Sequence, residues 1–187
     1  MENEISKVIT VLRSGGIILY PTDTVWGLGC DATNRDAVAK IYALKQNADK
    51  KAMLILCANA NAAVRYVNKA PSLAFDIMEM SEKPMTLILP NGMGIAENLI
   101  PEENTIGIRI PNHDFCSKLL FKFGKPIVST SANISGYYTP AGLKDVSQEI
   151  VEGVDYVVNP RFQGKPTGVP SSIISLTEDG QVKVIRE

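Results

Sequence analysis

Histidine is almost absent from this sequence, which has one, His113, among its 187 residues. There is also no Gly-x-Ser-x-Gly motif, so the sequence does not favour a serine hydrolase with a Ser-His-Asp triad. His113 follows Ile110-Pro111-Asn112 at the expected start of a helix, where we predict that it caps that helix. Neither a Gly-Lys-Ser/Thr phosphate loop nor a Gly-x-Gly-x-x-Gly fingerprint occurs. An enzyme with this sequence is expected to position substrates and neutralise charge rather than supply a nucleophile.

Cysteine is also scarce. Cys30, Cys57 and Cys116 are odd in number, and their spacing matches no metal-binding pattern. We therefore predict reduced thiols in the core, with neither disulfides nor a metal site built by the protein.

Long apolar runs are missing, and none is long enough to span a bilayer. Residues Met1 to Glu4 are acidic and lack the basic and apolar parts of a secretory signal. These absences predict a cytoplasmic protein with no membrane association. A length of 187 residues suits one well-buried domain, and no Gly-, Ser- or Pro-rich linker divides residues 1–187.

The formal net charge of -1 argues against a protein that coats nucleic acid indiscriminately. Positive charge is nevertheless concentrated in two regions, residues 40–65 and residues 109–125. A site for an anionic ligand and a solvated charged surface both fit this distribution.

Hydrophobic periodicity predicts an alternation of helices and strands. Expected helices cover residues 5–12, 34–45, 61–67, 72–80, 114–123 and 143–151, and the first ends at Gly15-Gly16. Expected strands cover residues 17–20, 52–57, 85–89, 105–110, 127–130, 156–159, 172–176 and 182–185. Asp179-Gly180 marks a hairpin between the last two strands, which calls for antiparallel pairing. The fold class is therefore α/β with α+β character: one domain with a twisted mixed β-sheet and flanking helices.

Small hydroxyl-bearing residues gather where several predicted strands begin or end. The most informative segment, residues 20–30, follows the apolar run 16–19 and reads as a buried strand that opens into an irregular loop. Residues 105–109, 129–136 and 166–172 have the same character. Hydroxyls and amides at strand ends can bind a polar small molecule through many short hydrogen bonds.

Taken together, these segments resemble one family, Sua5/YciO/YrdC. The resemblance runs from Gly16 to Arg186 and rests on five segments in the same order: Tyr-Pro-Thr-Asp-Thr-Val-Trp-Gly-Leu-Gly-Cys-Asp-Ala from residue 20, Ile-Tyr-Ala-Leu-Lys from 41, Ile-Gly-Ile-Arg-Ile-Pro from 106, Pro-Ile-Val-Ser-Thr-Ser-Ala-Asn-Ile-Ser-Gly from 126 and Pro-Ser-Ser-Ile-Ile from 170. The chain is most similar to the short, single-domain members, the threonylcarbamoyl-AMP synthases. The resemblance implies a YrdC-like fold without the C-terminal domain of the longer members.

The resemblance also implies a reaction. L-threonine, bicarbonate and ATP give threonylcarbamoyl-AMP and pyrophosphate, with Mg²⁺ held through the ATP phosphates. A partner protein complex then moves the threonylcarbamoyl group to adenosine 37 of tRNA. By matched position, threonine is held by Thr22, Arg109, Ser129 and Ser171, and Arg109 and Lys45 are the expected catalytic residues.

Carried over in the same way, the ATP contacts are Lys45, Lys51, Thr105, Ser131, Asn133, Thr139 and Arg186. The sequence departs from the family at two positions: a Lys-x-Arg-Pro pattern is usual and Asn47 replaces its arginine here, and Ser175 stands where the family more often has Asp, a change with no physical explanation. Loss of one charge-assisted hydrogen bond costs about 1.5–3 kcal/mol of binding free energy. Lys50 or Lys51 can offer a point charge there, without the bidentate geometry of arginine.

Two other functions stay open on the sequence alone. A paralogue like the YciO branch would share the fold and use a different nucleotide or substrate, and Asn47 is its main support. A non-catalytic protein that binds double-stranded RNA or tRNA would use the two basic regions, in keeping with the family's affinity for structured RNA.

Overall fold

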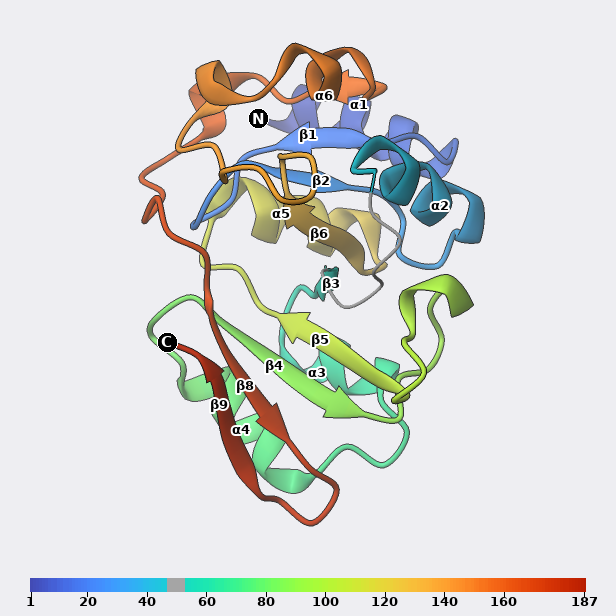
Figure 1. Ribbon diagram of the computed structural model, residues 1–187, viewed down its shortest axis with the longest axis vertical. Helices are drawn as coiled ribbons and strands as arrows, with labels where there is room; N and C mark the ends of the chain where they lie inside the picture. Colours follow the sequence, from blue (N-terminus) through green and yellow to red (C-terminus); the bar gives the residue numbers. More distant parts are fainter. Residues whose placement is uncertain (47–52) are drawn as a thin grey trace.

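The computed structural model describes residues 1–46 and 53–187. Their strands are β1 (Ile18–Tyr20), β2 (Gly27–Gly29), β3 (Leu54–Leu56), β4 (Met85–Pro90), β5 (Thr105–Arg109), β6 (Ile127–Ser131), β7 (Tyr156–Val157), β8 (Ser172–Leu176) and β9 (Val182–Arg186). In the described residues they form one sheet in the order β7-β1-β2-β6-β3-β5-β4-β8-β9. The strands β1, β2 and β6 fill the upper half of Figure 1, and β3, β5, β4, β8 and β9 fill the lower half.

The sheet is mixed, as predicted. β1 pairs with β7, β3 with β5 and β4 with β8 in parallel, whereas the other neighbouring pairs are antiparallel. β6 joins the two halves because it pairs with β2 on one side and with β3 on the other. The predicted hairpin joins β8 to β9 and ends the sheet.

Helices flank the sheet. They are α1 (Glu2–Arg13), α2 (Arg35–Leu44), α3 (Ala60–Ala63), α4 (Ser72–Met80), α5 (Asp114–Phe123) and α6 (Gln148–Glu152), with short 3₁₀ turns η2 (Val64–Tyr66), η3 (Glu97–Leu99), η4 (Leu143–Asp145) and η5 (Pro160–Phe162). Local capping explains several boundaries. Asn34 accepts hydrogen bonds from the first N–H groups of α2, and Gly124 ends α5 with a positive φ of 75°. His113 caps α5 as predicted, because its Nδ1 accepts from the Cys116 N–H.

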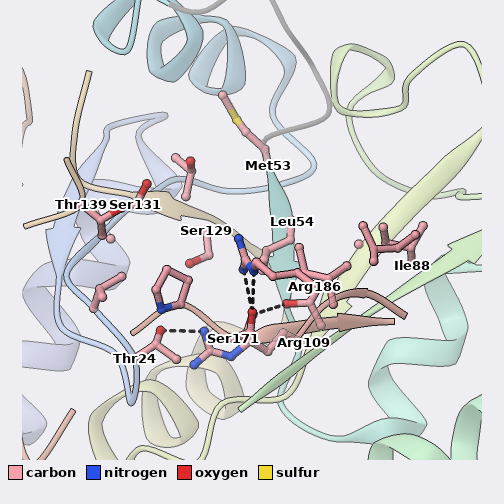
Figure 2. A pocket seen from close by; sticks show the side chains of 18 of the residues that line it. Thr24, Met53, Leu54, Ile88, Arg109, Ser129, Ser131, Thr139, Ser171 and Arg186 are labelled. Carbon is pink, nitrogen blue, oxygen red and sulfur yellow. Dashed lines mark hydrogen bonds between the residues drawn. The ribbon is translucent and has the colours of Figure 1, made fainter. Parts of the chain in front are cut away.

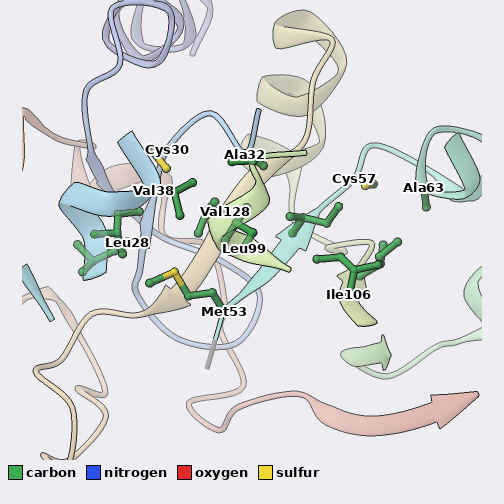
Figure 3. Packing of buried hydrophobic residues seen from close by; sticks show 14 of the residues in the cluster. Leu28, Cys30, Ala32, Val38, Met53, Cys57, Ala63, Leu99, Ile106 and Val128 are labelled. Carbon is green, nitrogen blue, oxygen red and sulfur yellow. The ribbon is translucent and has the colours of Figure 1, made fainter. Parts of the chain in front are cut away.

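Two hydrophobic clusters lie on opposite faces of the sheet, and alternation along the strands divides residues between them. Ile18 and Tyr20 of β1 pack with α1 and α5, whereas Leu19 between them joins the larger cluster. Figure 3 shows part of that larger cluster, with Leu28 and Val38 at one side of the view, Val128 and Leu99 in its centre and Cys57 and Ala63 at the other side. All three cysteines are buried and free, as predicted. Within the described residues, no helix is long and apolar enough to cross a membrane.

Strand β2 corrects one prediction, because residues 20–30 were expected to form an irregular loop after β1. Glycines disfavour strands, and β2 contains two of them. Tertiary contact overrides this preference, since a Cβ added at Gly29 would lie 2.7 Å from Cε1 of Tyr20 and 2.9 Å from the carbonyl oxygen of Val128. Only glycine lets β2 fit between its neighbours at this point.

Two predicted helices are shorter than expected. Residues 143–151 form η4 and then α6, because the chain is extended at Val146 and Ser147. Side-chain caps explain the break: Asp145 Oδ2 accepts from the Gly142 N–H, and Ser147 Oγ accepts from the Ile150 N–H. Residues 61–67 form the end of α3 followed by η2, with Asn59 capping α3.

Candidate functional site

A pocket of about 1000 Å³ opens on the face of the sheet that carries Leu54, beside the cluster of α1 and α5. Ten of the predicted site residues line it, from segments that are spread along the sequence, and Figure 2 labels six of them. They are Thr22, Lys45, Thr105, Arg109, Ser129, Ser131, Asn133, Thr139, Ser171 and Arg186. Lys51, and with it Asn47 and Lys50, lies outside the described residues. The structure thus brings together every predicted site residue that it describes.

Arg109 is the last residue of β5. It lines the pocket and is only 4% exposed. Its Nη2 forms an ion pair with Asp23, and its Nη1 donates to Thr24 Oγ1 at 2.9 Å (Figure 2). The third nitrogen, Nε, is buried and has no hydrogen-bond partner among the described residues. A buried N–H without an acceptor costs about 1–3 kcal/mol, so this guanidinium is ready to bind an anionic ligand.

The threonine hydroxyls next to Arg109 form a directed chain. Thr22 Oγ1 donates to the carbonyl oxygen of Val25 at 2.8 Å and accepts from the Thr24 N–H at 3.1 Å. Because a hydroxyl has one hydrogen, the 2.9 Å bond between Thr22 and Thr24 must have Thr24 as its donor. The Thr22 hydroxyl therefore has its donor and both acceptor positions occupied, and it orients Thr24 toward Arg109.

Ser171, just before β8, is held on two sides. Its hydroxyl lies 2.7 Å from that of Thr86 in β4, and both side chains are buried. Its carbonyl oxygen accepts hydrogen bonds from Nε and Nη2 of Arg186, which Figure 2 shows as dashed lines. The last strand of the chain therefore contacts the pocket wall directly.

Lys45, which follows α2, organises the loop after β6. Its Nζ donates to the carbonyl oxygens of Ser131 at 2.7 Å and Asn133 at 2.6 Å, and its own carbonyl oxygen accepts from the Ser135 N–H. Burial lowers the pKa of Lys45 to about 8. One of its three ammonium donors remains for a ligand.

Asn133 shapes the same loop. Its Nδ2 donates to the carbonyl oxygens of Ile134 and Tyr137, at 2.9 and 2.8 Å. Its Oδ1 is buried without a partner in the described part of the chain, so it is an acceptor for a ligand donor. Of the other predicted residues, Thr105 begins β5, Ser129 is buried within β6, and Thr139 follows this loop.

Sequence reasoning assigned no role to Asp23, Thr24 or Thr86, although all three are buried at or next to the pocket. Asp23 and Thr24 directly follow Thr22 in the most informative segment, and this position could have indicated that they lie at the site. Thr86 had only its position in a predicted strand. The pairing of Asp23 with Arg109 joins residues that are 86 positions apart, and spacing alone cannot reveal it.

Much of the positive charge in the two basic regions is engaged within the protein. Lys122 pairs with Glu2 and Lys125 with Asp31, while Lys45 and Arg109 are buried in the pocket. Less charge is therefore available for nucleic-acid phosphates than the sequence suggests.

A protein-built cation site is not evident. The described residues contain no group of three or more His, Cys, Asp and Glu side chains that could hold a metal ion. Glu103 is the carboxylate among the pocket-lining residues, and Asp23 is committed to Arg109. Mg²⁺ does not require such a cage, since it is commonly held by one or two carboxylates together with substrate phosphates and water.

Comparisons with known proteins show the family and the fold. A threonylcarbamoyl-AMP synthase from Pseudoalteromonas translucida is 33% identical over 175 residues, covering 92% of each chain. Another from Photobacterium profundum is 32% identical and covers 88% of this chain and 90% of the relative. Among solved structures, E. coli YciO has a TM-score of 0.82 at 26% identity and covers 100% of this chain and 90% of its own.

A structure of P. abyssi Sua5 complexed with L-threonine has a TM-score of 0.85 at 26% identity and covers 94% of this chain. The chain spans about half of that Sua5 chain, 52%. A family model named Sua5_yciO_yrdC, described as "Telomere recombination", matches residues 10–187. The chain therefore belongs to the Sua5/YciO/YrdC family.

Proposed function

We propose that this protein is an L-threonylcarbamoyladenylate synthase, which converts L-threonine, bicarbonate and ATP to threonylcarbamoyl-AMP and pyrophosphate. The observation that carries the proposal is the convergence on one pocket of ten residues that the family resemblance implied by position. The names of the curated relatives and the L-threonine complex of P. abyssi Sua5 support it. In this proposal the product serves the modification of adenosine 37 in tRNA, through a partner complex.

Threonine binds at the Arg109 end of the pocket in this account. Its carboxylate accepts from the unpartnered Nε of Arg109, because a charge-assisted bond satisfies that buried donor. Ser129 and Ser171 supply hydroxyls for the polar groups of the amino acid. Thr22 contributes mainly the wall of the site, since its hydroxyl is already saturated.

ATP binds toward Lys45 and the loop after β6. The free ammonium N–H of Lys45 donates a hydrogen bond to a phosphate oxygen. The unpartnered Oδ1 of Asn133 accepts one from the base or the sugar. The remaining proposed contacts are Thr105, Ser131, Thr139 and Arg186, with Lys51 added from the sequence. Mg²⁺ bound through the phosphates supplies further charge neutralisation.

The proposed chemistry needs no nucleophile from the protein. The amine of threonine adds to the carbon of bicarbonate, water is lost, and a carbamate forms. A carbamate oxygen then attacks the α-phosphorus of ATP, the bond to the β-phosphate oxygen breaks, and pyrophosphate leaves. Negative charge develops on carbamate and phosphate oxygens, where Lys45 and Arg109 can stabilise it.

Pyrophosphate release tests this proposal. We expect release only when L-threonine, bicarbonate, ATP and Mg²⁺ are all present, and strong loss of it in an Arg109→Met variant. Release that is indifferent to threonine would reject the proposal. That result would favour a YciO-like paralogue with another substrate, a candidate supported by the similarity to E. coli YciO and by Asn47.

A further inference from the structure

We propose that Asp23 is a positioning residue that holds Arg109 so that its Nε edge faces the carboxylate of the amino-acid substrate. This inference rests on the proposed function, because it names what makes the threonine end of that pocket selective. Asp23 acts through Arg109 and touches no ligand, since it is not among the residues that line the pocket.

The hydrogen-bond donors of Arg109 show how the guanidinium is oriented. One terminal nitrogen, Nη2, is paired with Asp23, and the other, Nη1, donates to Thr24. Both contacts come from one short loop, so the terminal nitrogens are fixed from one side. The nitrogen left without a partner in the described chain is Nε. An approaching carboxylate therefore meets a rigid donor whose direction is set before binding, which lowers the entropic cost of binding.

Charge gives Asp23 its second effect. Arg109 is almost fully buried, and an unpaired guanidinium there would carry a large desolvation cost. The Asp23 carboxylate offsets this charge while the pocket is empty. The Asp23→Asn substitution keeps the shape of the side chain and removes its charge. It therefore distinguishes an effect of the ion pair on Arg109 from an effect of packing.

The loop that carries Asp23 is itself anchored. Asp23 Oδ2 accepts from the Asn112 N–H at 3.2 Å, and its carbonyl oxygen accepts from the Thr167 N–H at 2.8 Å. The Thr24 carbonyl oxygen accepts from the Gly168 N–H at 2.9 Å. These bonds tie the loop to the segment after β5 and to the segment before β8. Asp23 is therefore held firmly enough to fix another side chain.

The test compares two ligands that differ in one group: L-threonine and L-threoninol, in which a hydroxymethyl group replaces the carboxylate. Calorimetry of the full chain is expected to show a clear preference for L-threonine in the wild type. Asp23→Asn should reduce threonine affinity about tenfold or more, with little change for threoninol, so that the preference collapses. The KM for ATP should stay within about twofold of the wild-type value.

Asp31→Asn is the matched control, because Asp31 is also a buried carboxylate in an ion pair, with Lys125, and does not line the pocket. It should lower the melting temperature and leave the ligand preference intact. Asp23→Ser also removes the carboxylate that pairs with Arg109 and provides a second variant if Asp23→Asn does not fold; it should also reduce the preference.

The outcomes separate this inference from the proposed function. A wild-type protein that does not prefer threonine over threoninol contradicts the threonine site itself. A wild-type preference that survives intact in folded Asp23→Asn, or in Asp23→Ser where Asp23→Asn does not fold, overturns the positioning role alone.

Discussion

Arg186 donates two hydrogen bonds to the carbonyl oxygen of Ser171, from Nε at 3.1 Å and from Nη2 at 2.6 Å. The first residue belongs to the proposed ATP contacts and the second to the proposed threonine contacts. Strand β9 is exposed along its length and lies at the end of the sheet. The two hydrogen bonds from Arg186 therefore connect the final hairpin to the pocket. They also link the two substrate positions through a single backbone oxygen.

Replacing Arg186 is therefore expected to affect both substrates. Arg186→Met removes both donors to Ser171, and hydrogen bonds from a charged group are worth about 1.5–3 kcal/mol when partly buried. We predict a rise of about tenfold in the KM for ATP and a smaller rise for threonine. Arg13→Met, at an exposed residue at the end of α1, is the control. An effect confined to ATP would show that the Ser171 contact does not couple the two positions.

Thr86 is expected to support threonine binding through Ser171. Thr86→Val keeps the shape of the side chain and leaves the Ser171 hydroxyl without its 2.7 Å partner. Without this bond the Ser171 hydroxyl is no longer oriented before binding, and the net worth of one hydrogen bond predicts threonine binding weaker by about 0.5–1.5 kcal/mol, measured by calorimetry. A Thr86→Ser variant retains the hydroxyl and should bind threonine nearly as the wild type does. Undiminished threonine binding by Thr86→Val would contradict this role of the Thr86 hydroxyl.

The lowered pKa of Lys45 predicts a pH dependence of ATP binding. With a pKa of about 8, the ammonium form falls from about nine-tenths at pH 7 to about one-tenth at pH 9. The KM for ATP should therefore rise across this interval. Lys45→Arg keeps its charge throughout and should flatten the profile. A wild-type KM that is constant from pH 7 to pH 9 would show that this charge does not bind ATP.

The same pKa shift has a defined sign for stability. The pKa is lowered on folding from 10.5 to about 8, so the unfolded chain binds more protons between these values. The contribution of Lys45 to the free energy of unfolding should therefore increase as pH rises from 8 to 10.5. Urea unfolding of the wild type and of Lys45→Met across this range measures the difference. The free energy of unfolding of the wild type minus that of Lys45→Met should rise with pH. A value that falls with rising pH would contradict this prediction.

Strand β2 is expected to be intolerant of side chains. Gly29→Ala places a Cβ 2.7 Å from Cε1 of Tyr20 and 2.9 Å from the Val128 carbonyl oxygen. Such overpacking costs about 1–3 kcal/mol, which urea unfolding can measure. Gly142→Ala is the matched control, since its new Cβ would meet only Asp145 Oδ2, at 3.7 Å. Equal stability of the two variants would contradict the tight packing of β2.

The sequence predicted those elements whose local pattern agrees with their tertiary setting. Apolar runs and caps located α1, α2, α5 and most strands, and the mixed sheet followed from the hairpin at Asp179-Gly180. Strand β2 was missed because its glycines are required by the neighbouring Tyr20 and Val128, which local propensity does not contain.

The pocket lining was largely predictable, because family resemblance identified residues by position. The contacts among the lining and neighbouring side chains were not predictable from the sequence. The ion pair between Asp23 and Arg109 and the contact between Arg186 and Ser171 depend on the folded geometry. A residue such as Lys45, predicted as a phosphate contact, is also the side chain that holds the loop after β6.

The decisive measurement follows labelled bicarbonate. The purified protein is incubated with ¹⁴C-bicarbonate, L-threonine, ATP and Mg²⁺, and the nucleotide products are separated. The proposed function predicts that the label appears in an adenylate with the mass of threonylcarbamoyl-AMP, that none forms without threonine, and that Arg109→Met produces far less. An adenylate product without label, or a labelled product that forms in the absence of threonine, would contradict the proposed function.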